Sequence, residues 1–525
     1  MRDEIANEIE FDNIPGRLKS YVSGLIRAFV VGLLVLMQFA IIIFMPFLLR
    51  NFTVYFYFVL EVFSIVVILG LVNANKSPSY KIAWISIVLI LPISGHIMYL
   101  LWGKPDSKRK LDRKVIQFID NGTNYLSIDQ DMEDAYEIQN PQNARISAYM
   151  RSQDFPLFKN NELTYYRMGE EAFHEIIASI EKAERFILVN FFIVAEGALW
   201  DSLHNVLLKK IQEGVEVKFM FDDFGAMFRT DSDFADQLRK EGFEVRIFNP
   251  VHKYASKLYM NYRDHQKIVV IDGNVGFTGG FNIADEYVNK INRFGRWKDT
   301  GIQIAGEGVW GLTVVFLQMW DVCSEKFEAE YDKYRPTLTS VCNDNYVRVI
   351  SDGPSNNPNN PIESIYLQMI EHANDKLYIS TPYLILENEM KDALIRAVKS
   401  GVDVRIITPY IPDKKMVKRL TNYNYEDLLK AGVRIFEYEP GFNHAKMIMN
   451  ESSCIVGTIN MDYRSFYLHY ENGVWVHAEA FLRDMEKDFI QMFEESREYT
   501  WEDWRNRPTS WKMTQPVLNL FSTLL

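Results

Sequence analysis

Residues 185–223 read RFILVNFFIVAEGALWDSLHNVLLKKIQEGVEVKFMFDD, and residues 376–410 read KLYISTPYLILENEMKDALIRAVKSGVDVRIITPY. Each stretch has an apolar segment, an amphipathic helical pattern, and a Gly-Val-acid-Val step into a second apolar segment. A further helix and strand follow in both copies, with KEGFEVRIF from Lys240 and KAGVRIFEY from Lys430. The pattern predicts two copies of a strand-helix-strand unit, in which parallel strands form a sheet covered by helices.

The repeat organises most of the chain. Because its period is about 180 residues, it indicates a duplicated domain and not a solenoid of short units. We expect an α/β fold with duplicated sheet domains at residues 156–340 and 341–525. Residues 104–155 are polar and rich in Asp, Asn and Gln, so we expect a linker or an irregular lead-in there. Residues 1–103 hold an N-terminal tail and several apolar segments.

Composition excludes several classes of protein. A chain of 525 residues is too long for one core, so two or three domains are expected. The net charge of −12 argues against a nucleic-acid binder, which needs clustered Lys and Arg. The three cysteines are odd in number and scattered, which excludes a disulfide framework and shows no metal-ligand spacing.

Three apolar stretches lie at residues 28–49, 52–72 and 82–102, and each is close to the ~20 residues that a membrane-spanning helix needs. The first and third carry no charged residue, and the second carries only Glu61. A cleaved signal peptide fits poorly, because the apolar tracts are too long and too many. We therefore expect two to three transmembrane helices and a multi-pass protein of the cell membrane.

A basic run follows the third stretch and predicts the side of the catalytic part. It consists of Lys104, Lys108, Arg109, Lys110, Arg113 and Lys114. The positive-inside rule places such a run, and the domains beside it, in the cytoplasm. Only Arg50 and Asn51 separate the first two stretches. Either three spans leave the N-terminus outside, or the first stretch lies in or re-enters the membrane.

Both copies of the repeat end in a histidine motif. The first is His265-Gln266-Lys267, followed by four apolar residues, Asp272, and then Gly279-Gly280-Phe281-Asn282. The second is His444-Ala445-Lys446, followed by Gly457-Thr458-Ile459-Asn460. Residues two apart in an extended segment project from the same face, so each imidazole and ammonium converge on one point. The glycines allow close backbone approach, and each Asn can hydrogen-bond across the site.

These residue types suit phosphodiester chemistry. Lys267 and Lys446 can hold the non-bridging phosphate oxygens. One neutral imidazole can attack phosphorus to give a phosphohistidine, and a second, protonated imidazole can protonate the leaving alkoxide. Two histidines in one charged pocket do not titrate alike, which supplies one base and one acid. This chemistry needs neither a metal nor an organic cofactor.

The motif H-x-K-x-x-x-x-D with a later G-G-x-N or G-x-x-N resembles that of the phospholipase D superfamily. Longer segments resemble the bacterial cardiolipin synthases: YMNYRDHQKIVVIDG, GGFNIADEYV and FGRWKDTGI in the first half, and ISTPYLILENEM, GVDVRIITPYIPD, EYEPGFNHAKMIM and NMDYRSFYLHYEN in the second. Residues 78–103 resemble the membrane-anchor hairpin of the same family. The resemblance implies two phospholipase D-like domains and the condensation of two phosphatidylglycerol molecules to cardiolipin, with release of glycerol.

The resemblance also implies roles for particular residues. It makes His265, Lys267, Asp272, His444 and Lys446 catalytic, with His265 favoured as the nucleophile and His444 as the general acid. Substrate binding is implied for Asn282, Asn460, Glu286 and Glu471, with both glutamates placed to orient the histidines. Membrane phospholipid is the implied partner, and nucleic acid is not.

The second motif departs from the pattern, because Met-Ile-Met-Asn-Glu follows Lys446 and puts Glu451 where the family has Asp. Glu451 is expected to take the catalytic Asp's place, with Asn450 as the other candidate. A phospholipase D-type hydrolase that releases phosphatidic acid is the main rival function. A nuclease or phosphodiesterase is disfavoured by the apolar segments, and an inactive scaffold by the intact His and Lys pairs.

Overall fold

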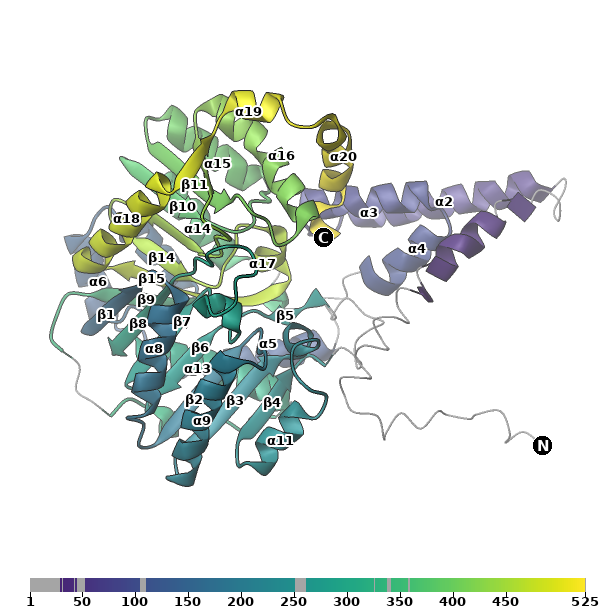
Figure 1. Ribbon diagram of the computed structural model, residues 1–525. Coiled ribbons are helices and arrows are strands. Elements are labelled where there is room, and N and C mark those ends of the chain that lie inside the picture. Colours follow the sequence, from purple (N-terminus) through teal and green to yellow (C-terminus); the bar gives the residue numbers. More distant parts are fainter. Residues whose placement is uncertain are drawn as a thin grey trace, which may run out of the picture.

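The computed structural model describes residues 29–30, 32–41, 43–44, 52–103, 110–250, 261–324, 326–337, 341–356 and 359–524. Two α/β units lie against each other, and an arm of helices projects from their junction (Figure 1). The first unit is coloured blue to teal and the second green to yellow.

The first sheet has the strand order β1-β8-β7-β6-β2-β3-β4. Its strands are β1 (Asn161–Tyr166), β2 (Phe186–Phe191), β3 (Glu216–Asp222), β4 (Glu244–Phe248), β6 (Ile268–Ile271), β7 (Val275–Gly279) and β8 (Gly301–Gly306). Its connections carry α8 (Gly169–Ile180), α9 (Ala198–Gln212), α10 (Asp223–Ala226), α11 (Phe234–Lys240) and the 3-10 helix η5 (Asp285–Val288).

The second sheet has the order β16-β12-β11-β10-β13-β14-β15-β5, and β9 also pairs with β15. Its strands are β9 (Tyr346–Asp352), β10 (Lys376–Ser380), β11 (Asp403–Pro409), β12 (Arg434–Tyr438), β13 (Met447–Asn450), β14 (Cys454–Gly457), β15 (His469–His477) and β16 (Ser496–Tyr499), with β5 (Arg263–Asp264) from the first half. Its helices are α14 (Pro361–Glu371), α15 (Asn388–Lys399), α16 (Lys415–Ala431), α17 (Tyr463–Tyr467) and α18 (Glu479–Glu494).

The predicted duplication is confirmed by strand pairing. Strands β2, β3 and β4 pair in parallel, as do β10, β11 and β12. In each half an antiparallel strand then joins the first of the three, β6 against β2 and β13 against β10. The histidine motifs therefore enter their sheets at equivalent places.

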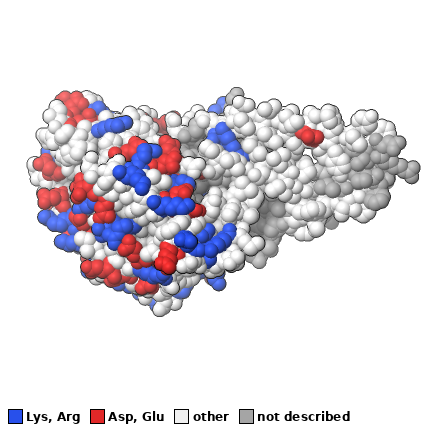
Figure 2. Space-filling model, turned by 90° about the horizontal axis from the view of Figure 1, so that it is seen from above, with Lys and Arg blue, Asp and Glu red and all other residues white. Residues whose placement is uncertain are grey.

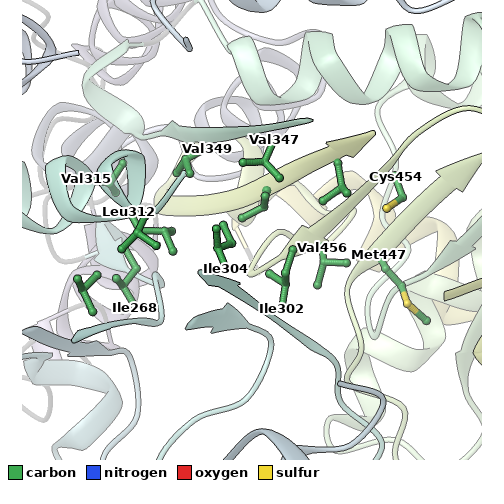
Figure 3. Close-up of a cluster of buried hydrophobic side chains, with 14 of the residues drawn as sticks. Ile268, Ile302, Ile304, Leu312, Val315, Val347, Val349, Met447, Cys454 and Val456 are labelled. Carbon is green, nitrogen blue, oxygen red and sulfur yellow. The ribbon is translucent and has the colours of Figure 1, made fainter. Parts of the chain in front are cut away.

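The two sheets share one hydrophobic core, centred on α13 (Val309–Ser324) (Figure 3). Ile268 and Ile302 of the first sheet, Leu312 of α13, and Val347 and Met447 of the second sheet are all at most 1% exposed. Fully burying such a side chain contributes roughly 1.5–3 kcal/mol, so the two sheets stabilise each other. This packing fixes the relative position of the two motifs.

Residues 110–152 correct the expectation of a linker or irregular lead-in. They form α5 (Lys110–Thr123), α6 (Gln130–Gln139) and α7 (Ala144–Ser152). Buried side chains from all three helices pack on the α/β units: Phe118 of α5 contacts Phe327, and Tyr136 and Met150 belong to the core of the second unit. Polar composition did not exclude a packed helix here. Even the charged Glu133 is buried, because it pairs with buried Arg348 at 2.9 Å.

The projecting arm consists of α2 (Thr53–Val72), α3 (Pro78–Ile90), α4 (Ser94–Met98) and the π-helical turn η3 (Tyr99–Gly103). On the face shown in Figure 2, charged side chains are spread over the α/β units but nearly absent from the arm. Among the described residues, only Val54–Val72 is both long and apolar enough to cross a membrane, and about a tenth of its residues (11%) are buried in the protein. Apolar side chains so exposed favour a lipid environment.

The structure does not establish the apolar stretches at 28–49 and 82–102 as membrane spans. The stretch at 82–102 is not one long helix, because the chain turns around Pro92 between α3 and α4. The turn brings Gly95 against the backbone of Ile87, where a Cβ would lie 2.5 Å from the carbonyl oxygen. The stretch at 28–49 lies partly outside the described residues, as do Lys104, Lys108 and Arg109 of the basic run. More than one span is therefore not established.

The base of the arm lies against the junction of the two halves. Tyr80 and Trp84 of α3 form a buried cluster with Tyr463 and Leu468 of the second half, and Tyr262 of the first half packs on it. The C-terminal helices α19 (Trp501–Arg505), α20 (Thr509–Leu520) and η8 (Ser522–Leu524) end beside α3 (Figure 1). The arm is thus attached where the two motifs meet.

Candidate active site

One cavity of about 680 Å³ lies between the halves and holds both histidines. His265 is in the extended segment that leads into β6, and His444 is in the matching segment before β13. Asn282 and Asn460 from the glycine turns also line this cavity. The predicted convergence of the two motifs on one site is therefore present in the structure.

His265 is held by residues of the second half. Its backbone N–H donates to the carbonyl of Tyr470 at 2.9 Å. Its Nδ1 lies 2.8 Å from Oε2 of Glu471, and both side chains are buried. With the carboxylate as acceptor, Nδ1 carries the proton and Nε2 keeps its lone pair. The proposed orienting role of Glu471 is thus supported by geometry.

His444 is held in the same way by the first half. Its backbone N–H donates to the carbonyl of Lys298 at 2.7 Å, and its Nδ1 lies 2.6 Å from Oδ2 of Asp299. Gly280 packs closely behind this carboxylate, since a Cβ there would lie 2.1 Å from Oδ1 of Asp299. Each imidazole is therefore oriented by a carboxylate from the other half of the chain.

Asp299 was missed by sequence reasoning, although the repeat contains a signal for it. Gly279 pairs with Gly301 in the first sheet, and Gly457 pairs with Gly473 in the second. Aligned on those glycines, Asp299-Thr300-Gly301 matches Glu471-Asn472-Gly473. An acid two residues before this glycine is the equivalent position in both halves.

Glu286 does not orient a histidine, which corrects the expectation drawn from the resemblance. Its Oε1 lies 2.5 Å from Nη1 of Arg229 and 3.2 Å from Nη1 of Arg293. The residue four positions after Asn460 is Arg464, so Glu286 and Glu471 are not counterparts in the repeat. A position after the motif Asn therefore does not predict which glutamate contacts a histidine.

Lys267 and Lys446 are buried and stand outside the cavity lining of the substrate-free protein, and each ammonium donates to the carbonyl of the histidine two residues before it. Burial lowers the pKa of Lys267 to about 7 and that of Lys446 to about 8. The charge of Lys446 also lowers the pKa of Lys267, so the two ammonium groups repel each other, and an anion placed between them would relieve the repulsion. The pair is therefore suited to bind phosphate oxygens.

The two imidazoles differ in basicity. Burial lowers the pKa of both, but Asp299 opposes the shift at His444, whose pKa is about 4. At His265 the neighbouring Lys267 and His469 add to the effect of burial, and its pKa falls well below the usual value. His444 is thus the imidazole that holds a proton more readily.

Comparison with known proteins agrees with this site. The chain is 32% identical over 455 residues to a cardiolipin synthase of Geobacillus kaustophilus, covering 86% of this chain and 90% of that one. It is 31% identical over 489 residues to cardiolipin synthase 1 of Staphylococcus aureus, covering 89% and 96% of the two chains. The chain belongs to the cardiolipin synthase family. It is accordingly a phosphatidyltransferase of the phospholipase D superfamily.

Further matches support this membership. The family model "cardiolipin synthase, PLD-like domain" matches residues 176–293 and 366–493, one match in each half. A second model, "phospholipase D-nuclease N-terminal", matches residues 62–104 in the arm. The fold resembles the crystal structure of phosphatidylserine synthase from Haemophilus influenzae, with a TM-score of 0.56 at 14% identity over 72% of this chain and 97% of that one.

Asp272, the Asp of the cardiolipin synthase motif, supports the fold. Asp272 lies at the far end of β6 from His265, and its carboxylate accepts backbone N–H groups of Glu184, Arg185 and Phe186 at 2.7–3.0 Å. It fixes the start of β2 and does not line the cavity. The expectation that Asp272 acts catalytically is therefore not supported by its position.

Glu451 takes the place of Asp272 in the second half. Its carboxylate accepts the backbone N–H groups of Asn374 and Asp375, just before β10, at 3.0 and 3.4 Å. Asn450 instead accepts the N–H groups of Ser452 and Ser453 within its own turn. Glu451 is thus the positional substitute, but it lies at the sheet edge and outside the cavity lining.

Asn282 and Asn460 reach the cavity from the two glycine turns. Asn282 is held by the N–H of Ile193 and the hydroxyl of Tyr287, at 3.0 and 2.9 Å. The side-chain oxygen of Asn460 has no hydrogen-bond partner among the described residues. This unpaired, buried oxygen is available for a substrate hydroxyl.

One group among the described residues has the composition of a metal site: His265, His469 and Glu471. The His469 ring lies 5.3 Å from that of His265, so this histidine belongs to the first motif in space, although it is near the second in sequence. The ammonium of Lys267 acts on all three groups and disfavours a second cation. We assign no metal to it.

Proposed function

We propose that the protein condenses two phosphatidylglycerol molecules to cardiolipin and glycerol through a phosphohistidine on His265. The observation that carries the proposal is the single cavity that both His265 and His444 line, with each imidazole oriented by a carboxylate from the opposite half. Family membership supplies the overall reaction, the synthesis of cardiolipin by phosphatidyl transfer.

In the first step, Nε2 of His265 attacks the phosphorus of the donor. The bond from phosphorus to the glycerol headgroup breaks, and Nε2 of His444 gives its proton to the departing oxygen. Lys267 and Lys446 stabilise the non-bridging oxygens, where negative charge accumulates. The products of this step are free glycerol, a phosphatidyl group on His265 and a neutral His444.

In the second step, a headgroup hydroxyl of the acceptor attacks the phosphohistidine. His444 takes the proton of this hydroxyl, the phosphorus–nitrogen bond breaks, and His265 is regenerated. The product carries two phosphatidyl groups on one glycerol, which is cardiolipin. No net proton is gained or lost over the two steps.

The difference in basicity between the two imidazoles supports His265 as the nucleophile and His444 as the general acid. A nucleophile must be unprotonated, and the pKa of His265 lies well below its usual value. A general acid must hold a proton when the donor is bound, and Asp299 raises the pKa of His444 against the effect of burial. The negative charge of a bound phosphodiester acts in the same direction, so His444 takes up a proton as the donor binds.

The arm supports a membrane location for the reaction. Its apolar helix α2 leads through α3 to the junction that holds the cavity, which suits substrates that stay in a bilayer. We propose that the catalytic halves lie on the cytoplasmic face, on the basis of the basic run at residues 104–114. A multi-pass anchor remains part of this proposal.

The reaction is tested by incubating the purified protein with phosphatidylglycerol vesicles and identifying the products. Cardiolipin and glycerol in equal amounts support the transferase. Phosphatidic acid in place of cardiolipin would show that water resolves the phosphohistidine, which is the hydrolase reaction.

A further inference from the structure

The condensation of two phospholipids requires two phosphate-binding places. The donor phosphate reacts between the two His-Lys pairs. The acceptor attacks through one end of its glycerol headgroup, while its own phosphodiester, on the other end, keeps its negative charge. A cavity lined partly by aromatic rings would disfavour that second charge unless cations met it.

Two arginines on the cavity wall are grouped around one carboxylate. Arg229 follows α10 and Arg293 follows η5, and both contact the same oxygen of Glu286. Two guanidinium groups and one carboxylate leave one net positive charge. Among the described residues, Glu286 is the only side chain that forms an ion pair with either arginine, so most of their N–H donors remain for another anion.

This cluster lies beside the proposed general acid. Tyr287 follows Glu286 in η5, and its ring lies 5.3 Å from the imidazole of His444. His444 is where the glycerol headgroup leaves and where the acceptor headgroup enters. The phosphodiester attached to that headgroup would therefore lie within reach of the arginines.

The other cations of the cavity wall have acidic neighbours of their own. Arg263 pairs with buried Asp222 at 3.3 Å. Lys414 and Arg464 share the wall with the carboxylates of Asp413 and Asp462. The Arg229–Arg293 cluster differs because two cations share one carboxylate.

Exposed apolar side chains flank the cluster. Phe228, next to Arg229, is 69% exposed, and Ile291, two residues before Arg293, is 53% exposed. Arginine beside exposed apolar side chains suits the boundary where a lipid phosphate meets its acyl chains.

We infer that Arg229 and Arg293, held by Glu286, bind the unreacted phosphodiester of the acceptor phospholipid. This inference rests on the proposed function, and it assigns to Glu286 the task of positioning two arginines.

The test compares two acceptors for the same phosphohistidine. With phosphatidylglycerol as donor, the acceptor is either a second phosphatidylglycerol, giving cardiolipin, or labelled free glycerol, giving labelled phosphatidylglycerol by headgroup exchange. Free glycerol has no phosphate and does not need the arginines. The double variant Arg229→Gln/Arg293→Gln is expected to lower cardiolipin formation about tenfold or more, the effect of losing charge-assisted hydrogen bonds. Glycerol exchange should stay within about twofold of the unchanged protein.

Arg296→Gln is the matched control. Arg296 lies in the same loop, but its guanidinium pairs with Glu495 and does not line the cavity. It should leave both reactions unchanged. An equal loss of exchange and cardiolipin formation in the double variant, or no loss of either, would overturn the inference. Failure of the proposed function has a different signature, since the unchanged protein would then form no cardiolipin, whether or not it exchanges glycerol.

Discussion

Nδ1 of His265 lies 2.8 Å from the carboxylate of Glu471, which is 206 positions further along the chain. The second histidine repeats this relationship in the opposite direction, since Nδ1 of His444 lies 2.6 Å from Asp299, 145 positions before it. Neither copy of the duplicated fold therefore contains a complete catalytic unit. The shared core keeps the two copies in register, so core packing and catalysis are linked.

Replacing Asp299 should reduce turnover through His444. Asp299→Asn keeps the size of the side chain but removes the charge that raises the pKa of His444, so we expect glycerol exchange to fall about 10²-fold or more. The activity that remains should be shifted to lower pH, because the general acid loses its proton more readily. Glu286→Gln is the comparison and should leave glycerol exchange nearly unchanged. A larger loss in Glu286→Gln would return the orienting role to Glu286.

Asp272 and Glu451 should affect stability more than catalysis. Asp272→Ala leaves backbone N–H groups at the start of β2 without their acceptor, which costs about 1–3 kcal/mol for each buried donor left unsatisfied. Thermal unfolding of the detergent-solubilised protein should show a lower Tm for Asp272→Ala than for Glu451→Ala, because Glu451 is exposed. The folded fraction of each variant should keep near-normal turnover. Lost turnover at an unchanged Tm would show a catalytic role.

Binding of phosphate should weaken as pH rises. The pKa of Lys267 is about 7 and that of Lys446 about 8 in the free protein, because burial disfavours the charged form. A bound anion favours the charged form, so binding takes up protons between about pH 7 and the ordinary lysine pKa of about 10.4. The inhibition constant of inorganic phosphate should therefore increase from pH 7 to pH 9. An inhibition constant that stays the same over this range would contradict the lysine pairing.

The same pKa values predict how the stability of the substrate-free protein varies with pH. Because the folded-state pKa of each lysine is below its unfolded value, the unfolded chain binds more protons between these values. Stability should then rise with pH from about 7 upward, in the absence of phosphate. Phosphate should reduce this slope, which chemical denaturation at several pH values would measure.

Labelling of a native cysteine can show on which side of the membrane the catalytic halves lie. Cys342 is exposed on the catalytic part, whereas Cys454 is buried. If the catalytic halves are cytoplasmic, a membrane-impermeant thiol reagent should label Cys342 only after the cells are permeabilised. Cys342→Ser gives the background, and Lys110→Cys in that variant reports on the basic run. Labelling of either cysteine in intact cells would reverse the orientation.

The sequence predicts the fold and the four central residues because both depend on local pattern. Strand and helix periodicity shows the duplication, and spacing within each motif identifies His265, Lys267, His444 and Lys446. The partners of the histidines come from the other half, so they depend on how the two sheets pack. Asp299 was missed for that reason. Glu286 was expected to orient a histidine because it matches an acidic position of the family that follows Asn282, and sequence alone does not show that it pairs with Arg229 and Arg293 instead.

Two further differences have local physical causes. The segment at 104–155 was expected to be a linker because it is polar and rich in Asp, Asn and Gln. One of its acidic residues, Glu133, is nevertheless buried, because it pairs with Arg348 from a distant part of the chain. The stretch at 82–102 has the composition of a span, but the turn around Pro92 divides it, and composition alone does not show where the chain reverses.

The most direct test of the account is to trap the covalent intermediate. With a donor labelled on phosphorus and carrying a good leaving group, acid-sensitive label should be recovered on the peptide that contains His265. His444→Ala should still form this adduct, because a good leaving group needs little protonation. His265→Ala should form none. Label on the His444 peptide, or adduct formation by His265→Ala, would contradict the account.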